Sequence, residues 1–405
     1  MITVPLHTLP IKRRPPPVLR ERLNAVAFNV VFGLSLVLIH AFQLAVLPLA
    51  LIPHPYAQTA YSAAALYAKE AFASDLILIT HLFGPAKLVL TADESVNLDE
   101  LVRRDEAGRV IGFNVAKQAV WISNHQMYAD WIYPWILMSF AGVSSGLVII
   151  LKASLEWAPI VGPAMQLFHF CFIDNRRKTL AKSNLFRTAQ AVRKRDEPYQ
   201  ALLFPEGTLY SGLTQPRSAK YAATMGIPDA INVLLPRATG MLFTLRCLLT
   251  VFPSPSLALY DLTVGYAGVP ARGYAQDYYS LQSIFGRGVS PPTVHLHFRQ
   301  VRLADVPLGE VRASARPQHV EKEITPAEKA AFEAWLRARW AEKDELMGAF
   351  GTTGEFPTGR QGRVEFEITM RPVDWVVLAS IPVGLAFAWK VYGTLWTLVR
   401  TLALF

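Results

Sequence analysis

Two long apolar stretches, one near each end of the chain, are the strongest features of the hydrophobic pattern. The first, residues 24–53, contains no Asp, Glu, Lys or Arg, and the second, residues 375–398, contains only Lys390. About twenty apolar residues are enough to cross a bilayer as a helix, so both stretches predict membrane helices. Gly33 and Pro48 interrupt the first stretch, and a re-entrant hairpin that does not cross the bilayer is therefore an alternative.

The chain before the first apolar stretch is polar, Pro-rich and basic. Its positive charges are Lys12, Arg13, Arg14, Arg20 and Arg22. Because membrane proteins carry an excess of Lys and Arg on the cytosolic side, the N-terminus is expected in the cytosol. One complete crossing then places the following domain in the lumen, whereas a re-entrant segment keeps that domain in the cytosol.

A second helix is expected at residues 61–82, shortly after the first apolar stretch. It is apolar but carries Lys69, Glu70 and Asp75, and charged side chains are costly inside a bilayer. We therefore expect this helix at the membrane interface or beneath the globular domain, and not across the membrane.

Between the two ends, short apolar runs alternate with segments of helical periodicity. Strands are expected at residues 87–90, 119–122, 147–151, 170–173, 201–204, 257–264 and 294–298, and helices at 178–195, 218–225 and 239–251. Residues 94–114 are charged and are expected to form a surface excursion. The alternation predicts an α/β domain, in which helices flank a mixed sheet, with membrane helices at both ends of the chain.

The last expected strand alternates three apolar residues with His295 and His297, which predicts that the two histidines face solvent. After it, residues 326–348 have the periodicity of a long amphipathic helix. The chain is thus expected to have five parts: a basic tail (1–23), N-terminal membrane and interfacial helices (24–85), a central α/β domain (86–302), an accessory region with the amphipathic helix (303–370) and a C-terminal membrane helix (371–405).

The composition supports a membrane protein and argues against several other classes. Hydrophobic residues make up 52% of the chain and charged residues 18%, against roughly a quarter charged in ordinary soluble proteins. The net charge is +9, but no basic run is long enough for a nucleic-acid arm, so anionic lipids or phosphorylated substrates are the expected partners. Cys171 and Cys247 belong to no metal-type cluster, and neither disulfides nor a metal site is expected.

The candidate chemistry begins where the strand at 119–122 ends in Ser123-Asn124-His125, with Asp130 five residues after the histidine. On an ideal helix residues this far apart point about 140° away from each other, so the pair can meet only if His125 precedes the first helical turn. One ring nitrogen can then donate to Asp130 while the other accepts the proton of a substrate hydroxyl. The spacing alone is a weak motif, and an ordinary histidine at a helix N-terminus fits it equally well.

A second segment strengthens this interpretation. Phe204-Pro205-Glu206-Gly207-Thr208 follows a short buried strand, and its tight turn presents a carboxylate and a hydroxyl at the end of that strand. Ligands of α/β domains bind at the ends of strands. A plain strand-to-loop turn remains the alternative, since Pro and Gly are common turn residues.

Together these segments resemble the glycerolipid acyltransferase family, which contains the 1-acylglycerol-3-phosphate acyltransferases. The resemblance rests on the motifs Asn124-His125 to Asp130, Phe204 to Thr208, and Leu234-Leu235-Pro236-Arg237, and it covers residues 119–238 most clearly. The forms of the first and third motifs are similar to those of the lysocardiolipin and lysophosphatidylinositol acyltransferase branch, including its fungal members.

The resemblance implies transfer of a fatty acyl group from acyl-CoA, as co-substrate and without a cofactor, to a lysophospholipid hydroxyl. The acceptor is then lysophosphatidic acid, lysophosphatidylinositol or lysocardiolipin, and the location is an integral membrane position in the endoplasmic reticulum. It further implies that His125 is the general base and Asp130 its partner. Substrate-binding roles fall to Glu206, Gly207, Thr208, Pro236 and Arg237.

One family motif departs from its usual form. Where the family has Phe-Ile-x-Arg, this chain has Phe172-Ile173-Asp174-Asn175, and the arginines follow as Arg176 and Arg177. A phosphate needs N–H donors or a positive charge nearby, which Arg176 or Arg177 can supply. The departure keeps open a catalytically silent, lipid-binding relative. A membrane hydrolase with the same His/Asp pair is a third possibility, although the chain has no Ser elbow and no metal motif.

Overall fold

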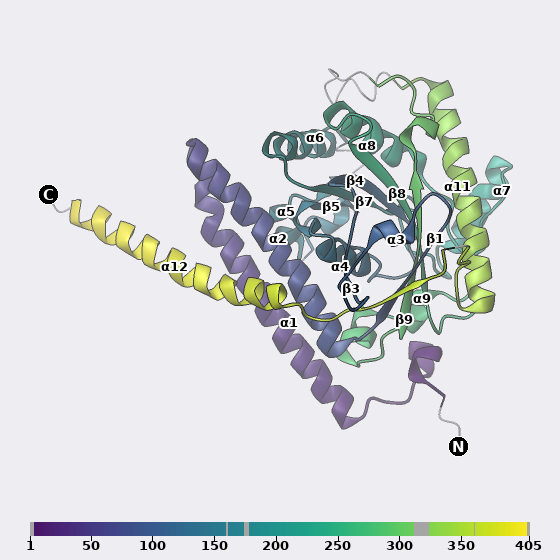
Figure 1. Ribbon diagram of the computed structural model, residues 1–405, viewed down its shortest axis with the longest axis horizontal. Coiled ribbons are helices and arrows are strands. Elements are labelled where there is room, and N and C mark those ends of the chain that lie inside the picture. Colours follow the sequence, from purple (N-terminus) through teal and green to yellow (C-terminus); the bar gives the residue numbers. More distant parts are fainter. Residues whose placement is uncertain (1–3, 159–160, 174–177, 312–323, 360, 403–405) are drawn as a thin grey trace.

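A computed structural model describes the chain except residues 1–3, 159–160, 174–177, 312–323, 360 and 403–405. Its centre is an eight-stranded mixed sheet with the order β10-β1-β9-β8-β4-β7-β5-β6 (Figure 1). The strands are β1 (Lys87–Ala92), β4 (Gln118–Ser123), β5 (Leu147–Lys152), β6 (Cys171–Ile173), β7 (Tyr199–Leu203), β8 (Leu257–Tyr266), β9 (Thr293–Val301) and β10 (Val364–Glu367). The α/β class, the mixed sheet and the long apolar helices at both ends confirm the predicted fold class.

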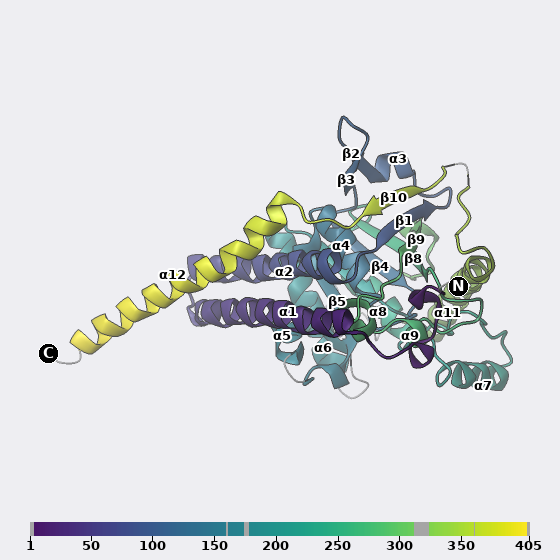
Figure 2. The same cartoon turned by 90° about the horizontal axis from the view of Figure 1, so that it is seen from below.

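Helices lie on both faces of this sheet, and the long helices near the two ends of the chain extend away from one side of it (Figures 1 and 2). They are α1 (Leu19–Val46), α2 (Pro55–Phe83), α3 (Leu98–Leu101), α4 (Ile132–Phe140), α5 (Val161–Leu167), α6 (Lys178–Arg195), α7 (Gln215–Met225), α8 (Ala238–Val251), α9 (Ala275–Tyr278), α11 (Pro326–Thr353) and α12 (Pro372–Leu402). Gly226 ends α7 in the left-handed conformation, at the position where the sequence predicts the stop.

Two hydrophobic cores, one on each face, fix the sheet between its helices. Successive side chains of a strand point to opposite faces, and in β4 Trp121 belongs to one core while Val120 and Ile122 belong to the other. The first core includes α2 and α4, and the second includes α6, α8 and α11. The near-continuous apolar sequence of β4 follows from this double burial.

Five adjacent strands, β8, β4, β7, β5 and β6, run in the same direction, and this places several loops at one edge of the sheet. β4 pairs in parallel with β7 and β8, β7 with β5, and β5 with β6. The segments that follow β4, β5, β7 and β8 therefore leave the sheet at the same edge. β9 is antiparallel to β8, and β1 is parallel to β9.

The long terminal helices pack together beside the sheet domain (Figure 2). A short 3-10 turn, Leu47–Leu51, separates α1 from α2, and both contact α12, for example through a hydrogen bond of 2.5 Å between Tyr67 Oη and Ser380 Oγ. Among the described residues, two helices are long and apolar enough to cross a membrane, Leu19–Leu51 and Pro372–Thr401. In α2 the half nearer the sheet is buried, and Lys69 there donates to the carbonyl of Leu147 at 2.8 Å, which agrees with its expected place beneath the domain.

The expectation that His295 and His297 face solvent is wrong. Both residues are only 5% exposed, because β9 lies between β1 and β8 inside the sheet and aromatic rings cover this face. His295 contacts Phe350, and His297 contacts Phe356 and shares a hydrogen bond of 2.9 Å with Thr91 Oγ1. Alternation of apolar and polar residues indicates two faces, but here both faces are covered.

Three further features were not predicted. The surface excursion contains α3 and a hairpin of β2 (Val102–Arg104) and β3 (Val110–Phe113). β10 pairs antiparallel with β1 and thereby adds a strand from the region after α11 to the edge of the sheet. Near the N-terminus, Arg14 is 8% exposed and donates to Ser283 Oγ and the carbonyl of Tyr278, so the segment before α1 packs against the domain.

Candidate active site

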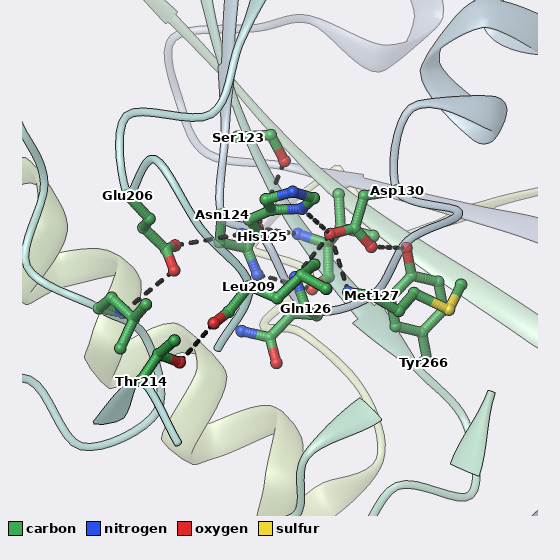
Figure 3. A network of polar contacts seen from close by, with 12 residues as sticks. Ser123, Asn124, His125, Gln126, Met127, Asp130, Glu206, Leu209, Thr214 and Tyr266 are labelled. Carbon is green, nitrogen blue, oxygen red and sulfur yellow. Dashed lines mark hydrogen bonds and ion pairs between the residues drawn. The ribbon is translucent and has the colours of Figure 1, made fainter. Parts of the chain in front are cut away.

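His125 and Asp130 both lie in the loop between β4 and α4. β4 ends at Ser123 and α4 begins at Ile132, so the histidine precedes the first helical turn, as the sequence argument required. The Nδ1 atom of His125 lies 2.8 Å from Oδ2 of Asp130 (Figure 3). The loop therefore brings together two residues that an uninterrupted helix would separate.

Asp130 is fully buried and its two oxygens receive several hydrogen bonds. Besides the His125 ring, Oδ2 accepts the backbone N–H groups of Gln126 at 2.5 Å and Met127 at 3.0 Å. The other oxygen, Oδ1, accepts the hydroxyl of Tyr266 at 2.5 Å. A buried carboxylate is costly unless donors surround it, and these donors hold Asp130 in one orientation.

The ring of His125 is partly open to solvent and rests on an aromatic neighbour. Its side chain is 20% exposed, and its ring stacks on Phe204 with centroids 4.3 Å apart and planes 24° apart. No residue that the structure describes makes a hydrogen bond with Nε2. If Nδ1 donates its proton to Asp130, Nε2 carries a free lone pair that can accept a proton.

Glu206 is a buried residue whose carboxylate binds the backbone of His125. It is 2% exposed, and Oε1 accepts the backbone N–H of His125 at 3.1 Å while Oε2 accepts that of Leu234 at 3.2 Å. The indole of Trp340 in α11 also donates to Oε1, at 3.4 Å. Burial raises the pKa of Glu206 to about 8, although these donors act in the opposite direction. The carboxyl group thus joins the His125 loop, the segment around Leu234 and α11.

The other predicted binding residues lie beside one another at the same edge of the sheet. Gly207 has a φ of +69°, and the space where its Cβ would lie is 3.3 Å from Cδ of Arg237. The backbone N–H of Arg237 donates to the carbonyl of Pro205 at 2.8 Å. Thr208 and Pro236 are half-buried and Arg237 is exposed. The structure therefore brings the second and third motifs into contact, while their roles in binding stay predictions.

We expect Gly207→Ala to disturb this contact. An L-residue in the left-handed region costs about 1–2 kcal/mol, and the added methyl group would also press on Arg237. Gly226→Ala is the matched control, because Gly226 also has a positive φ (+62°) but has no atom within 4 Å of its Cβ position. Both variants should lose similar stability in thermal unfolding, whereas only Gly207→Ala should lower the rate of the reaction. An equal effect of both on the rate would exclude a role for the Arg237 contact.

Two predicted residues, Arg176 and Arg177, lie outside the described residues. Three other residues near the site were not predicted from the sequence: Tyr266 at the end of β8, Trp340 on α11 and Lys152 at the end of β5. Lys152 is the exposed last residue of β5, and burial together with the nearby charge of Arg237 lowers its pKa. Trp340 was predicted only as part of the apolar face of the helix at 326–348, and Tyr266 follows the strand predicted at 257–264. Their polar atoms meet partners far away in the sequence, which no local pattern shows.

Two family profiles match the chain, and both describe acyltransferases. The profile described as Acyltransferase matches residues 96–255, which include His125, Asp130 and Glu206, and the profile described as Acyltransferase C-terminus matches residues 318–378. The chain belongs to the acyltransferase family with this C-terminal region, which confirms the resemblance found in the sequence motifs.

Relatives with curated names include several enzymes of lysophospholipid acylation. The chain is 32% identical over 311 residues to a 2-acyl-1-lysophosphatidylinositol acyltransferase of Saccharomyces cerevisiae, which covers 69% of this chain and 72% of the yeast protein. It is 30% identical over 243 residues to lysocardiolipin acyltransferase 1 of Danio rerio, which covers 60% and 55%, respectively. A lysophosphatidylinositol acyltransferase of Caenorhabditis elegans is also 30% identical, over 254 residues that cover 61% and 56%.

Proposed function

We propose that this protein transfers a fatty acyl group from acyl-CoA to a free hydroxyl of a lysophospholipid. The observation that carries the proposal is the 2.8 Å contact between His125 Nδ1 and Asp130 Oδ2, which leaves Nε2 without a partner among the described residues. A hydroxyl is a poor nucleophile unless its proton leaves as it attacks, and a positioned imidazole can take that proton. The names of the relatives support a lysophospholipid as the acceptor.

In the proposed mechanism, His125 Nε2 accepts the proton of the acceptor hydroxyl as its oxygen attacks the thioester carbonyl. The resulting imidazolium donates through Nδ1–H to Asp130, whose negative charge stabilises it. The tetrahedral intermediate then collapses, so that the new C–O ester bond remains and the C–S bond breaks. The CoA sulfur leaves and receives the proton from His125, which restores the neutral ring. No bond between enzyme and acyl group is needed.

The predicted binding residues fit an acceptor that carries a hydroxyl close to a phosphate. Arg237 is exposed beside Gly207, and Thr208 lies in the same turn. We propose that this edge, together with Arg176 or Arg177, holds the phosphate, and that Pro236 shapes the acyl-CoA site. Glu206 acts from behind by holding the backbone of His125. Lysophosphatidic acid, lysophosphatidylinositol and lysocardiolipin all share this chemistry.

The two apolar helices support a position at a membrane, where a lysophospholipid acceptor is found. α1 and α12 extend to the same side of the sheet domain (Figure 2), and several of their large apolar side chains are exposed, including Val30, Leu34, Phe387 and Trp389. We propose that these helices embed in the endoplasmic reticulum membrane and hold the domain at its surface.

A panel of lysophospholipids tests the proposed function. The full-length protein in detergent or vesicles is incubated with oleoyl-CoA and, separately, lysophosphatidic acid, lysophosphatidylinositol, monolysocardiolipin or lysophosphatidylcholine. We expect CoA release together with a diacyl product for at least one acceptor that carries an anionic head group. Free fatty acid without a diacyl product would indicate a hydrolase. Lipid binding without CoA release for any acceptor would indicate a silent relative and contradict the proposal.

A further inference from the structure

We propose that Tyr266 is a positioning residue that fixes the orientation of Asp130 and, through it, of His125. The inference rests on the proposed acyl transfer, for which His125 is the base. Tyr266 is the last residue of β8, 2% exposed, and its hydroxyl lies 2.5 Å from Oδ1 of Asp130 (Figure 3). It lies outside the three motifs that carry the family resemblance most clearly, in residues 260–266, where that resemblance continues more loosely.

The register of the sheet explains why Tyr266 reaches Asp130. β8 pairs with β4 as far as Ser123, which lies opposite Leu262. Beyond β4, the side chain of Asn124 continues the pairing, because its Nδ2 donates to the carbonyl of Val264 at 2.9 Å and its Oδ1 accepts the N–H of Val264 at 2.8 Å. β8 therefore extends under the loop that holds His125, and its final side chain meets the carboxylate there.

The hydrogen bond from Tyr266 divides the donors of Asp130 between its two oxygens. Oδ2 receives His125, Gln126 and Met127, and Oδ1 receives Tyr266. Burial and the charge of Asp130 raise the pKa of Tyr266 well above its ordinary value, so the hydroxyl stays protonated and donates at every pH at which the enzyme folds. The donor draws negative charge toward Oδ1 and opposes rotation of the carboxylate.

Removal of this donor has two consequences for His125. The carboxylate becomes a stronger acceptor on Oδ2, so the imidazolium form of His125 is stabilised relative to the neutral base. The carboxylate can also rotate, so the ring spends less time with Nε2 aimed at the acceptor. His125 acts as a base only when neutral, so a more stable imidazolium moves the acid limb of the pH–rate profile to higher pH.

Tyr266→Phe tests this inference because it removes only the hydroxyl. We expect kcat to fall about tenfold, as for the loss of one hydrogen bond to a charged group, and the acid limb to move to higher pH. KM for the lysophospholipid should change less than kcat. An acid limb and a kcat that both match the wild-type protein would overturn the inference.

Two other titratable residues near the His125–Asp130 pair, Tyr133 and Glu206, determine the choice of controls. Tyr133 of α4 faces Asp130 and Tyr266, with ring centroids of the two tyrosines 6.1 Å apart, and its hydroxyl has no hydrogen-bond partner among the described residues. Tyr133→Phe is therefore matched in chemistry and burial, and it should leave the acid limb unchanged. Burial raises the pKa of Glu206 to about 8, so its titration affects the alkaline part of the pH–rate profile. The acid limbs of the variants are therefore compared below pH 7. A structural effect alone would lower the unfolding temperature in both variants without moving the limb.

A second measurement separates this inference from the proposed function. Diethyl pyrocarbonate modifies neutral histidine, and mass spectrometry of the peptide that contains His125 gives its rate of modification at each pH. This pH dependence should move to higher pH in Tyr266→Phe and not in Tyr133→Phe. Failure of the wild-type protein to turn over any lysophospholipid would contradict the proposed function alone, whereas equal midpoints in all three proteins would contradict the role of Tyr266.

Discussion

His125→Ala is expected to lower kcat by about a hundredfold to ten-thousandfold, the contribution of a positioned general base. Without the imidazole, the acceptor hydroxyl must attack the thioester while it still holds its proton. In this variant Asp130 loses its bond to the imidazole but keeps three other donors, which are the backbone N–H groups of Gln126 and Met127 and the hydroxyl of Tyr266. The loop should therefore stay folded, and the loss should appear in kcat more than in KM.

The measurement is CoA release, followed with a thiol reagent at saturating acyl-CoA and acceptor. Both cysteines of the chain, Cys171 and Cys247, are buried, so the folded protein adds little background to this assay. His81→Ala is a suitable control, because His81 is an exposed histidine near the end of α2 and its removal should leave the rate unchanged. Full activity in His125→Ala would remove His125 from the mechanism.

Lys343→Met is expected to cost about 3–5 kcal/mol of stability, the typical effect of breaking one side of a buried ion pair. The ammonium of Lys343 donates to Asp261 Oδ1 at 2.6 Å, to the carbonyl of Leu262 at 2.5 Å and to Thr263 Oγ1 at 3.0 Å. Its side chain is 1% exposed and that of Asp261 is 5% exposed. Methionine fills a similar volume but leaves the carboxylate of Asp261 buried without its counter-charge.

The double variant Lys343→Met/Asp261→Leu identifies the cause of this loss. Replacing a whole buried pair by apolar residues is often nearly neutral, so the double variant should recover most of the stability in thermal unfolding of the detergent-solubilised protein. An equal loss in the single and double variants would assign the effect to packing. The single variant should also slow acyl transfer, because Lys343 lies on α11 close to Trp340, which donates to Glu206 behind His125.

The sequence predicts those parts of the site that depend on short segments. The apolar run of β4 and the loop residues Ser123 and Asn124 predict a strand that ends just before His125, and the structure has this boundary. The strand before Glu206 and the end of α7 at Gly226 follow in the same way. In each case the residue types within a few positions determine the local conformation.

The parts that were missed depend on contacts between distant residues. The bond from Tyr266 to Asp130 requires the register of β8 against β4, which no local pattern contains. The two histidines of β9 are buried because the chain around Phe350 and Phe356 returns to cover them. Glu206 and Thr208 occupy one turn, yet only the fold shows that the carboxylate turns inward to backbone N–H groups.

The pairing of β10 with β1 has a consequence for how the chain is synthesised. β1 leaves the ribosome early, directly after the α1–α2 hairpin, but β9 is made much later and β10 later still. The nascent protein therefore carries the apolar helix α1 while β1 still has no neighbouring strand on either side. Because α12 follows β10 after only a few residues, the strand that covers the exposed sheet edge and the apolar helix α12 are synthesised close together in time. A ribosome that stops before residue 364 would release a protein with an open edge strand, the kind of surface that aggregates and that quality control removes.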